Sequence, residues 1–155
     1  WDNIQQRKGP NSAGHSMVDG ATEVSDHAMT EKNRRVIQSF VETVLVQRDI
    51  QSLARYISRE HYTEHNPRLS NAPDSLEQAL SQPPGRDPDS IRYRTCHRVL
   101  ALGNFVLSVC EGEANGRHAS FFDLYRLHQG KIVEHWDTRE TIPPRSEWKN
   151  DNGKF

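Results

Sequence analysis

Four runs in which apolar and polar residues alternate decide the fold of this 155-residue chain. They read IRYRTCHRVLAL (91–102), FVLSVCEGE (105–113), HASFFDLYRL (118–127) and KIVEHWDTRE (131–140). A period of two is typical of β-strands, because successive side chains point to opposite faces of a sheet. The sequences between the runs are short and contain glycine: GN at 103–104, ANGR at 114–117 and HQGK at 128–131. We therefore expect an antiparallel meander.

The residues before the meander have helical spacing instead. Residues 30–49 repeat apolar side chains every three or four positions, which predicts an amphipathic helix of about 16 residues with Thr30 as its N-cap. A second helical pattern starts at Asp49, and a short third one runs from about Asp74 to Leu80. Helices followed by long antiparallel strands predict an α+β fold in layers.

Composition limits the cellular context and the partners. Residues 1–28 collect Gly, Ser, Asn and Asp without an apolar period, so we expect a mobile N-terminal tail or a tag remnant, followed by one domain over 29–155. The net charge of −1 argues against a nucleic-acid partner. No apolar run approaches the roughly 20 residues of a membrane span. We therefore expect a cytoplasmic protein without a membrane partner, in which the two cysteines are reduced.

One carboxyl group falls on an apolar face of the third strand-like run. Asp123 shares its face with Phe121 and Tyr125, where burial raises the pKa of a carboxyl group unless a partner compensates. Asp123 is therefore either a structural acid paired with an Arg or a Tyr, or an acid in a functional pocket. In the next run His135 and Asp137 share one face, and the short turn brings that face close to Asp123.

Two further faces carry information. Arginines occupy one side of the first run, which predicts that Tyr93 and His97 on its other side point inward. Phe122 and Leu124 lie opposite Asp123, so the second face of the sheet is also apolar and suits a second copy of the chain.

Four motifs together resemble a known family: HYTEHNP (61–67), FFDLYR (121–126), GKIVEHWD (130–137) and the closing NDNGKF (150–155). The chain from Glu31 to Phe155 resembles the SnoaL-like polyketide cyclases of the nuclear-transport-factor-2-like superfamily, especially a bacterial branch of SnoaL-like aldol-condensation enzymes. The resemblance implies a cone of three N-terminal helices packed on a strongly curved antiparallel sheet, enclosing a pocket. It also implies a homodimer through the outer face of the sheet.

The resemblance assigns roles to individual residues. It implies Asp123 as the pocket acid or base, with His65 and His135 as catalytic proton carriers. The expected substrate-binding residues are Tyr62, Asn66, Phe121, Tyr125, Trp136, Asp137 and His97. The chain departs from the family pattern at 108–110, where relatives often carry a His, and at Glu140, where relatives often carry Gln.

The resulting hypothesis is a cofactor-free enzyme that uses general acid/base chemistry alpha to a carbonyl, as in isomerisation, cyclisation or aldol condensation. Its ligand would be small and apolar or carbonyl-containing. The same residues could instead activate water for hydrolysis or dehydration. An alternative is a non-catalytic ligand-binding or sensing domain with the same pocket. A metal site built from His61, His65 and His135 is a third and less favoured interpretation, so we expect neither metal nor cofactor.

Overall fold

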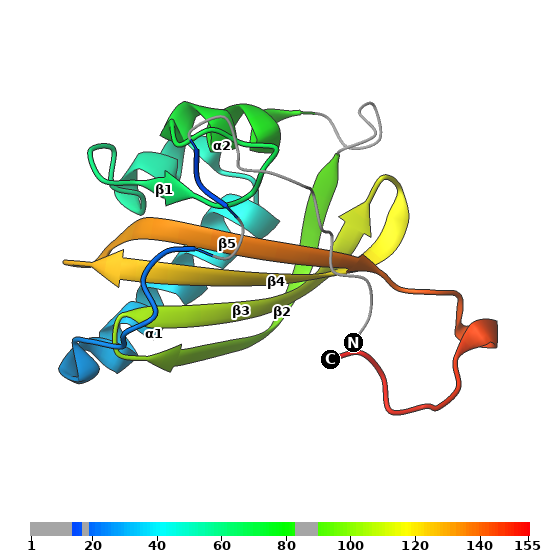
Figure 1. Ribbon diagram of the computed structural model, residues 1–155. Helices are drawn as coiled ribbons and strands as arrows, with labels where there is room; N and C mark the ends of the chain where they lie inside the picture. The colour runs from blue at the N-terminus through cyan, green and yellow to red at the C-terminus, as the bar shows by residue number, and fades with distance from the viewer. Residues whose placement is uncertain (1–13, 17–18, 83–89) are drawn as a thin grey trace.

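The computed structural model describes residues 14–16, 19–82 and 90–155 of an α+β protein (Figure 1). Helices and long strands do not alternate along the chain: the helical segments come first, and the four long strands follow. The elements are a 3₁₀ turn His27–Met29, α1 (Thr30–Phe40), a π-helical segment Val41–Val46, a 3₁₀ segment Ile50–Arg55, β1 (Thr63–Glu64), α2 (Pro73–Ser81), β2 (Ile91–Leu102), β3 (Phe105–Ala114), β4 (Arg117–His128), β5 (Lys131–Thr141) and a 3₁₀ turn Arg145–Glu147.

The meander and its turns are confirmed. Strands β2 to β5 pair in chain order and antiparallel, with Leu102 opposite Phe105 and His128 opposite Lys131. Both central residues of the last two turns have positive φ: 54° and 70° at Asn115 and Gly116, then 50° and 78° at Gln129 and Gly130. These are the values that two-residue hairpin turns of type I′ require, and glycine adopts them without steric cost.

The expected antiparallel sheet is wrong in one respect, because the sheet is mixed. Its strand order is β1-β5-β4-β3-β2, and β1 pairs in parallel with β5, placing Glu64 beside His135. The backbone N–H of His65 donates to the carbonyl of His135 at 3.0 Å. The HYTEHNP segment therefore forms an extended edge of the sheet, which the sequence pattern alone did not predict.

The three helical segments lie where the periodicity predicts them, with differences in type. α1 begins at Thr30 itself, and its first turn is preceded by Met29 rather than capped by the Thr30 side chain. The segment after Asp49 is a 3₁₀ helix, not an α-helix. α2 matches the predicted short helix to within a residue at each end. In Figure 1 α1 crosses one face of the sheet, whereas α2 lies beyond the β5 edge, near β1.

The main core forms between α1 with its π-helical extension and the meander. The rings of Phe40 on α1 and Tyr125 on β4 pack edge-to-face, with 5.6 Å between their centroids. Ile37, Val41 and Val44 are fully buried on the same helical face. Burial of an aliphatic or aromatic side chain contributes about 1.5–3 kcal/mol, so this helix is held mainly by packing.

Two irregularities in β2 decide which of its side chains face the core. Its pairing with β3 shifts register between Tyr93 and Thr95 and again between Cys96 and Arg98. Each bulge adds one residue and reverses the alternation beyond it. Tyr93 and Cys96 therefore face inward, and Cys96 lies opposite Cys110 with both thiols free.

The described parts of the N-terminal segment contact the sheet. The backbone N–H of Ser25 donates to Asn104 Oδ1 at 2.9 Å, and the Asn104 N–H donates to Ser25 O at 2.9 Å. Trp136 Nε1 donates to Asp19 O at 2.8 Å. The sequence carries no apolar period that would indicate these contacts. The domain boundary at residue 28 stays a prediction, but residues 19–28 do not lie free of the sheet.

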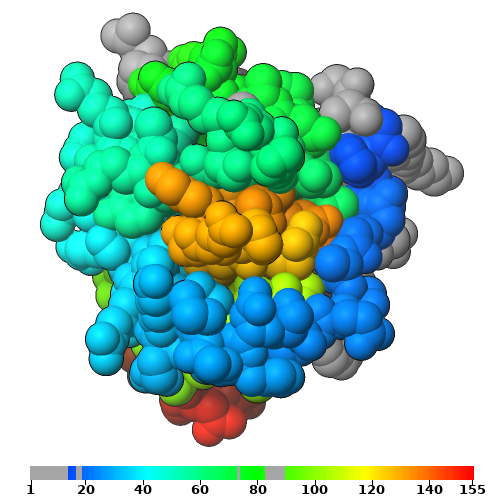
Figure 2. Space-filling view, turned by 90° about the vertical axis from the view of Figure 1, so that its left-hand side faces the viewer, coloured from blue at the N-terminus to red at the C-terminus, as the bar shows by residue number. Residues whose placement is uncertain are grey.

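Seen from the side, the β4–β5 turn lies between the N-terminal residues and the segment that leads to α2 (Figure 2). Within the described residues, every helix is too short or too polar to cross a bilayer.

Candidate functional site

A cavity of about 240 Å³ opens between the inner face of the sheet, α1 and α2. One end is apolar, with Phe40, Leu76 and Ile132 among its walls. The other end is polar and carries acids, a histidine, an amide and two arginines. These polar lining residues are Asp123, Asp137, His135, Asn66, Arg68 and Arg139. A mostly apolar pocket with a few convergent polar groups is the usual form of a small-molecule site.

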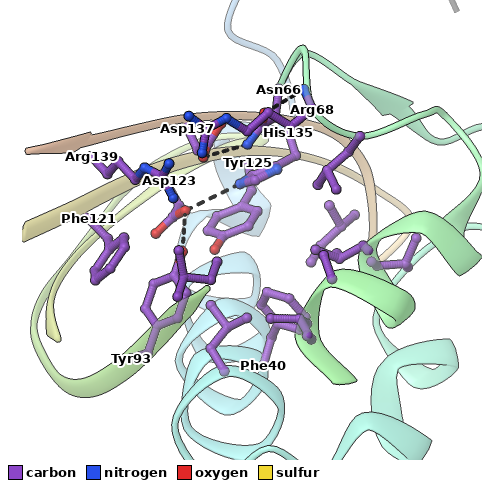
Figure 3. A pocket seen from close by; sticks show the side chains of 18 of the residues that line it. Phe40, Asn66, Arg68, Tyr93, Phe121, Asp123, Tyr125, His135, Asp137 and Arg139 are labelled. Carbon is purple, nitrogen blue, oxygen red and sulfur yellow. Dashed lines mark hydrogen bonds and ion pairs between the residues drawn. The ribbon is translucent and has the colours of Figure 1, made fainter. Parts of the chain in front are cut away.

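Asp123 lies at the polar end and is only 1% exposed. The Tyr93 hydroxyl donates to its Oδ1 at 2.9 Å, and Ser108 Oγ lies 3.4 Å from its Oδ2. His135 Nε2 lies 3.4 Å from Oδ1 (Figure 3). Three other strands, β2, β3 and β5, thus supply groups that stabilise a carboxylate, which offsets the cost of burying it.

His135 bridges two carboxylates. Its Nδ1 lies 3.1 Å from both oxygens of Glu64, while its Nε2 faces Asp123. Burial alone would lower the pKa of this imidazole, but Glu64 and Asp123 outweigh burial and raise it well above the usual value. The pKa of Glu64 is lowered despite the opposing effect of its burial, because His135, Tyr62 and the Asn66 N–H stabilise its charge.

Asp137 is the second acid of the cavity and the direct cross-strand neighbour of Asp123. Asn66 Nδ2 donates to its Oδ2 at 2.9 Å. Burial raises the pKa of Asp137 to about 7, with Glu64 and Asp123 adding to the increase and His135 opposing it. Near neutral pH a substantial fraction of Asp137 therefore carries a proton that it can donate.

Three buried phenols border these acids. Burial, reinforced by nearby carboxylates, raises the pKa of Tyr62, Tyr93 and Tyr125 well above the usual value of a phenol. They remain protonated at physiological pH, and two of them donate hydrogen bonds to carboxylates, Tyr93 to Asp123 and Tyr62 to Glu64.

Most of the residues expected in the site do line the cavity. Those that do are Asp123, His135, Tyr62, Asn66, Phe121, Tyr125 and Asp137. Figure 3 shows Asp123 between the Tyr93 hydroxyl and the His135 ring, with the Tyr125 ring beside them. The alternation of β4 and β5 predicts this face, because the two strands are regular over residues 119–126 and their partners.

His65 and Trp136 lie on the opposite face of the sheet. The two rings stack at 4.7 Å, and His65 Nε2 lies 2.9 Å from Glu134. His65 Nδ1 faces Asp19 and the Ser16 carbonyl of the N-terminal segment. The expectation that His65 and Trp136 lie in the pocket is therefore corrected. The reason is the strand β1: consecutive residues alternate faces, and its register with β5 turns Glu64 inward and His65 outward.

His97 is also outside the cavity. Its Nε2 lies 2.8 Å from Glu111, and its ring stacks on Phe155 at 4.3 Å. The first bulge of β2, at Arg94, reverses the facing that strict alternation predicts, and His97 is itself the extra residue of the second bulge.

Glu64 and Tyr93 belong to the polar network, although neither is among the site residues expected from the sequence. The sequence does carry a signal for Glu64. If residues 62–66 are extended, Tyr62, Glu64 and Asn66 share one face and His65 lies on the other. In the structure it is Glu64, not His65, that lies beside His135. The same extended backbone rules out the helical pairing of His61 with His65, and the His61 side chain is 75% exposed. Within the described part of the chain, no cluster of three or more His, Cys, Asp or Glu side chains is arranged to hold a metal ion.

Comparisons with known proteins place the fold. No protein-family profile and no curated protein matches the chain. Solved structures do, although their sequences are only distantly similar. A ketosteroid isomerase-like protein of Kribbella flavida matches with TM-score 0.63 and 15% identity, over 81% of this chain and 94% of that one. A protein of Cytophaga hutchinsonii described as NTF2-like matches with TM-score 0.56 and 15% identity, over 78% of this chain and 95% of that one. The fold is therefore nuclear-transport-factor-2-like.

Two other similar structures are named for enzymes of different reaction types. A SnoaL-like polyketide cyclase of Agrobacterium tumefaciens matches with TM-score 0.53 and 13% identity, over 70% of this chain and 91% of that one. An epoxide hydrolase of M. tuberculosis matches with TM-score 0.52 and 17% identity, over 72% and 84%. The resemblance seen in the sequence motifs is thus confirmed at the level of the fold, and the neighbours are named for unlike reactions.

Proposed function

We propose that this protein is a small-molecule enzyme of SnoaL-like type, which moves a proton alpha to a carbonyl by general acid/base catalysis. The observation that carries the proposal is the pair of carboxyl groups at the polar end of an apolar cavity. Asp123 and Asp137 face each other across β4 and β5, and their surroundings differ. Titratable neighbours in unlike environments are the usual form of an acid/base pair.

In the proposed step the Asp123 carboxylate removes a proton from the carbon alpha to the carbonyl. The electron pair of that C–H bond forms a carbon–carbon double bond to the carbonyl carbon, and the π pair of the C=O bond moves to the oxygen, which gives an enolate. Asp137, partly protonated at neutral pH, donates a hydrogen bond or its proton to this oxygen. Return of a proton to the same or another carbon completes an isomerisation; attack of the enolate carbon on a second carbonyl gives cyclisation or aldol condensation.

The walls support a ligand with an apolar body and a polar end. Phe40, Phe121 and Tyr125 offer flat apolar surface, and Asn66 reaches the polar end from the β1 edge. We propose that the helices and the sheet enclose this ligand as a cone and that the chain dimerises through the outer face of the sheet. Leu100 and Leu102 on β2 are each 56% exposed, which supports an interface on the sheet.

Proton exchange in D₂O tests the proposal without knowledge of the natural substrate. 2-Tetralone has acidic alpha protons and an apolar body, and loss of their NMR signals measures exchange directly. We expect wild type to accelerate exchange and Asp123→Asn to abolish the acceleration. Binding of 2-tetralone without any acceleration would contradict the proposal. Hydration of styrene oxide by wild type, with no ketone exchange, would instead indicate activation of water.

A non-catalytic ligand-binding domain is the second candidate. Its support is that both oxygens of Asp123 already have donors in Tyr93, Ser108 and His135, as in a structural network. A binding domain would take up an apolar fluorescent probe such as anilinonaphthalene sulfonate equally well in wild type and Asp123→Asn, and neither protein would accelerate exchange.

A further inference from the structure

Glu64 is a buried carboxylate that the proposed chemical step does not use. It is 0% exposed and lies on β1, the two-residue strand at the edge of the sheet. The Tyr62 hydroxyl donates to its Oε2, and the Asn66 N–H donates to its Oε1 at 2.9 Å. Together with His135, these donors satisfy both oxygens, so the carboxylate is held in one orientation.

The contacts of Glu64 determine what His135 can be. A neutral imidazole has one N–H and can donate to only one of two carboxylates, whereas an imidazolium donates from both nitrogens. His135 has Glu64 on its Nδ1 side and Asp123 on its Nε2 side, at 3.1 and 3.4 Å. Only the protonated ring can donate a hydrogen bond to both carboxylates, Glu64 on β1 and Asp123 on β4.

The other groups around the ring do not change this conclusion. From β4, the Tyr125 ring stacks on the imidazole at 5.0 Å and contributes no charge. From β5, Asp137 interacts with His135 electrostatically, and its ionised form also favours the imidazolium. The arginines that line the cavity, Arg68 and Arg139, are the positive groups at the same end. Burial is the largest single influence on the pKa of His135 and opposes its charge, but the two carboxylates in direct contact with the ring together outweigh burial.

We infer that Glu64 is a positioning residue, which keeps His135 as an imidazolium with its Nε2–H directed at the base Asp123. This role rests on the proposed function, in which Asp123 removes the proton. Oδ1 of Asp123 is held by two groups, the Tyr93 hydroxyl at 2.9 Å and His135 Nε2 at 3.4 Å, which leaves Oδ2, approached by Ser108 Oγ at 3.4 Å, as the oxygen that receives the proton. The developing enolate also gains from the fixed positive charge nearby.

A consequence concerns the edge of the sheet. Glu64 reaches His135 because β1 pairs with β5 in one register, with Glu64 beside His135. A slip of one residue would place His65 or Thr63 there and remove the carboxylate. The pairing of the short β1 strand with β5 therefore controls the charge of His135, the ring that contacts the base Asp123.

Histidine NMR tests the inference in the absence of any substrate. In wild type labelled with ¹⁵N-histidine, with His135 assigned from the spectrum of His135→Asn, both ring nitrogens of His135 should be protonated at pH 8. A neutral ring at pH 8 would overturn the inference without any variant at Glu64. In Glu64→Gln the carboxylate is gone but the shape is kept, and the midpoint of His135 titration should fall by at least one pH unit.

Glu134→Gln is the matched control. It removes a buried carboxylate from a histidine contact on the opposite face of the sheet, where Glu134 meets His65. It should leave the His135 midpoint unchanged. If the midpoint is the same in Glu64→Gln as in wild type, while the circular dichroism of both is normal, Glu64 does not hold the charge of His135.

The exchange of 2-tetralone separates this inference from the proposed function. In Glu64→Gln we expect a rate about tenfold or more below wild type at pH 8, because a larger fraction of His135 is neutral there. The deficit should shrink toward pH 6, where the ring regains its proton; a purely structural defect would be independent of pH. A shifted titration with unchanged exchange would overturn the positioning role. If wild type itself shows no exchange but the titration shift is present, the proposed function alone fails.

Discussion

Asp123→Asn is the perturbation on which the proposed chemistry depends most. The substitution keeps the shape of the side chain and removes its ability to accept a proton. The Tyr93 hydroxyl can still donate to the amide oxygen that replaces Oδ1. His135 loses one of its two carboxylates and retains Glu64. The fold should survive, because the substitution opens no cavity, Tyr93 keeps an acceptor for its hydroxyl and His135 keeps Glu64 as a carboxylate partner.

The magnitude follows from these contacts. Replacing charge-assisted hydrogen bonds by neutral ones costs about 1–2 kcal/mol of the free energy of unfolding. A positioned acid or base contributes roughly two to four orders of magnitude in rate, or about 3–5 kcal/mol of transition-state stabilisation. We therefore expect a small loss of stability, unchanged binding of an apolar probe and loss of nearly all proton transfer.

The assay combines urea unfolding, probe binding and deuterium exchange on the same preparations. Asp151→Asn is the control, because Asp151 lies on the surface with its side chain 85% exposed. It should match wild type in all three measurements. If Asp123→Asn instead loses about 3–5 kcal/mol, as expected when one member of a buried ion pair is removed, and binds no probe, then Asp123 is structural and the mechanism lacks its base.

Three further predictions concern charge, assembly and the N-terminal segment. In the folded protein the pKa of Asp137 is raised from 3.8 to about 7. Its ionisation therefore opposes folding as pH rises from about 4 to 7, by at most about 4 kcal/mol for roughly 3 pKa units. Asp137→Asn should stabilise the protein more at pH 8 than at pH 4.5, and urea unfolding with equal gains at both pH values would refute this. Light scattering at tens of micromolar should find a dimer that buries about 1,000 Å² or more, with Leu124→Arg shifting it to monomer; a wild-type monomer would remove the proposed interface. A chain without residues 1–24 should still fold, but melt lower because Trp136 loses its contact with Asp19, a cost of about 1–2 kcal/mol; an unchanged melting temperature would show that this contact contributes nothing.

The sequence predicted the regular part of the molecule well, for a local reason. In β4 and β5 the alternation is unbroken around Asp123 and Asp137, and two-residue turns fix the register between neighbouring strands. The face of each side chain then follows from its position alone. That is why Asp123, His135 and Asp137 were placed together without a structure.

Tertiary structure decided the remainder, because faces there depend on contacts that periodicity does not encode. The first of the two bulges in β2 turned His97 outward, although strict alternation places it on the same face as Tyr93. The parallel pairing of β1 with β5, between segments about 70 residues apart, turned Glu64 inward and His65 outward. A single-residue change of register reverses every facing, and only the long-range pairing fixes that register. The cavity face of β4 and β5 was therefore determined by sequence, whereas the carboxylate that holds His135 was determined by how the edge strand docks.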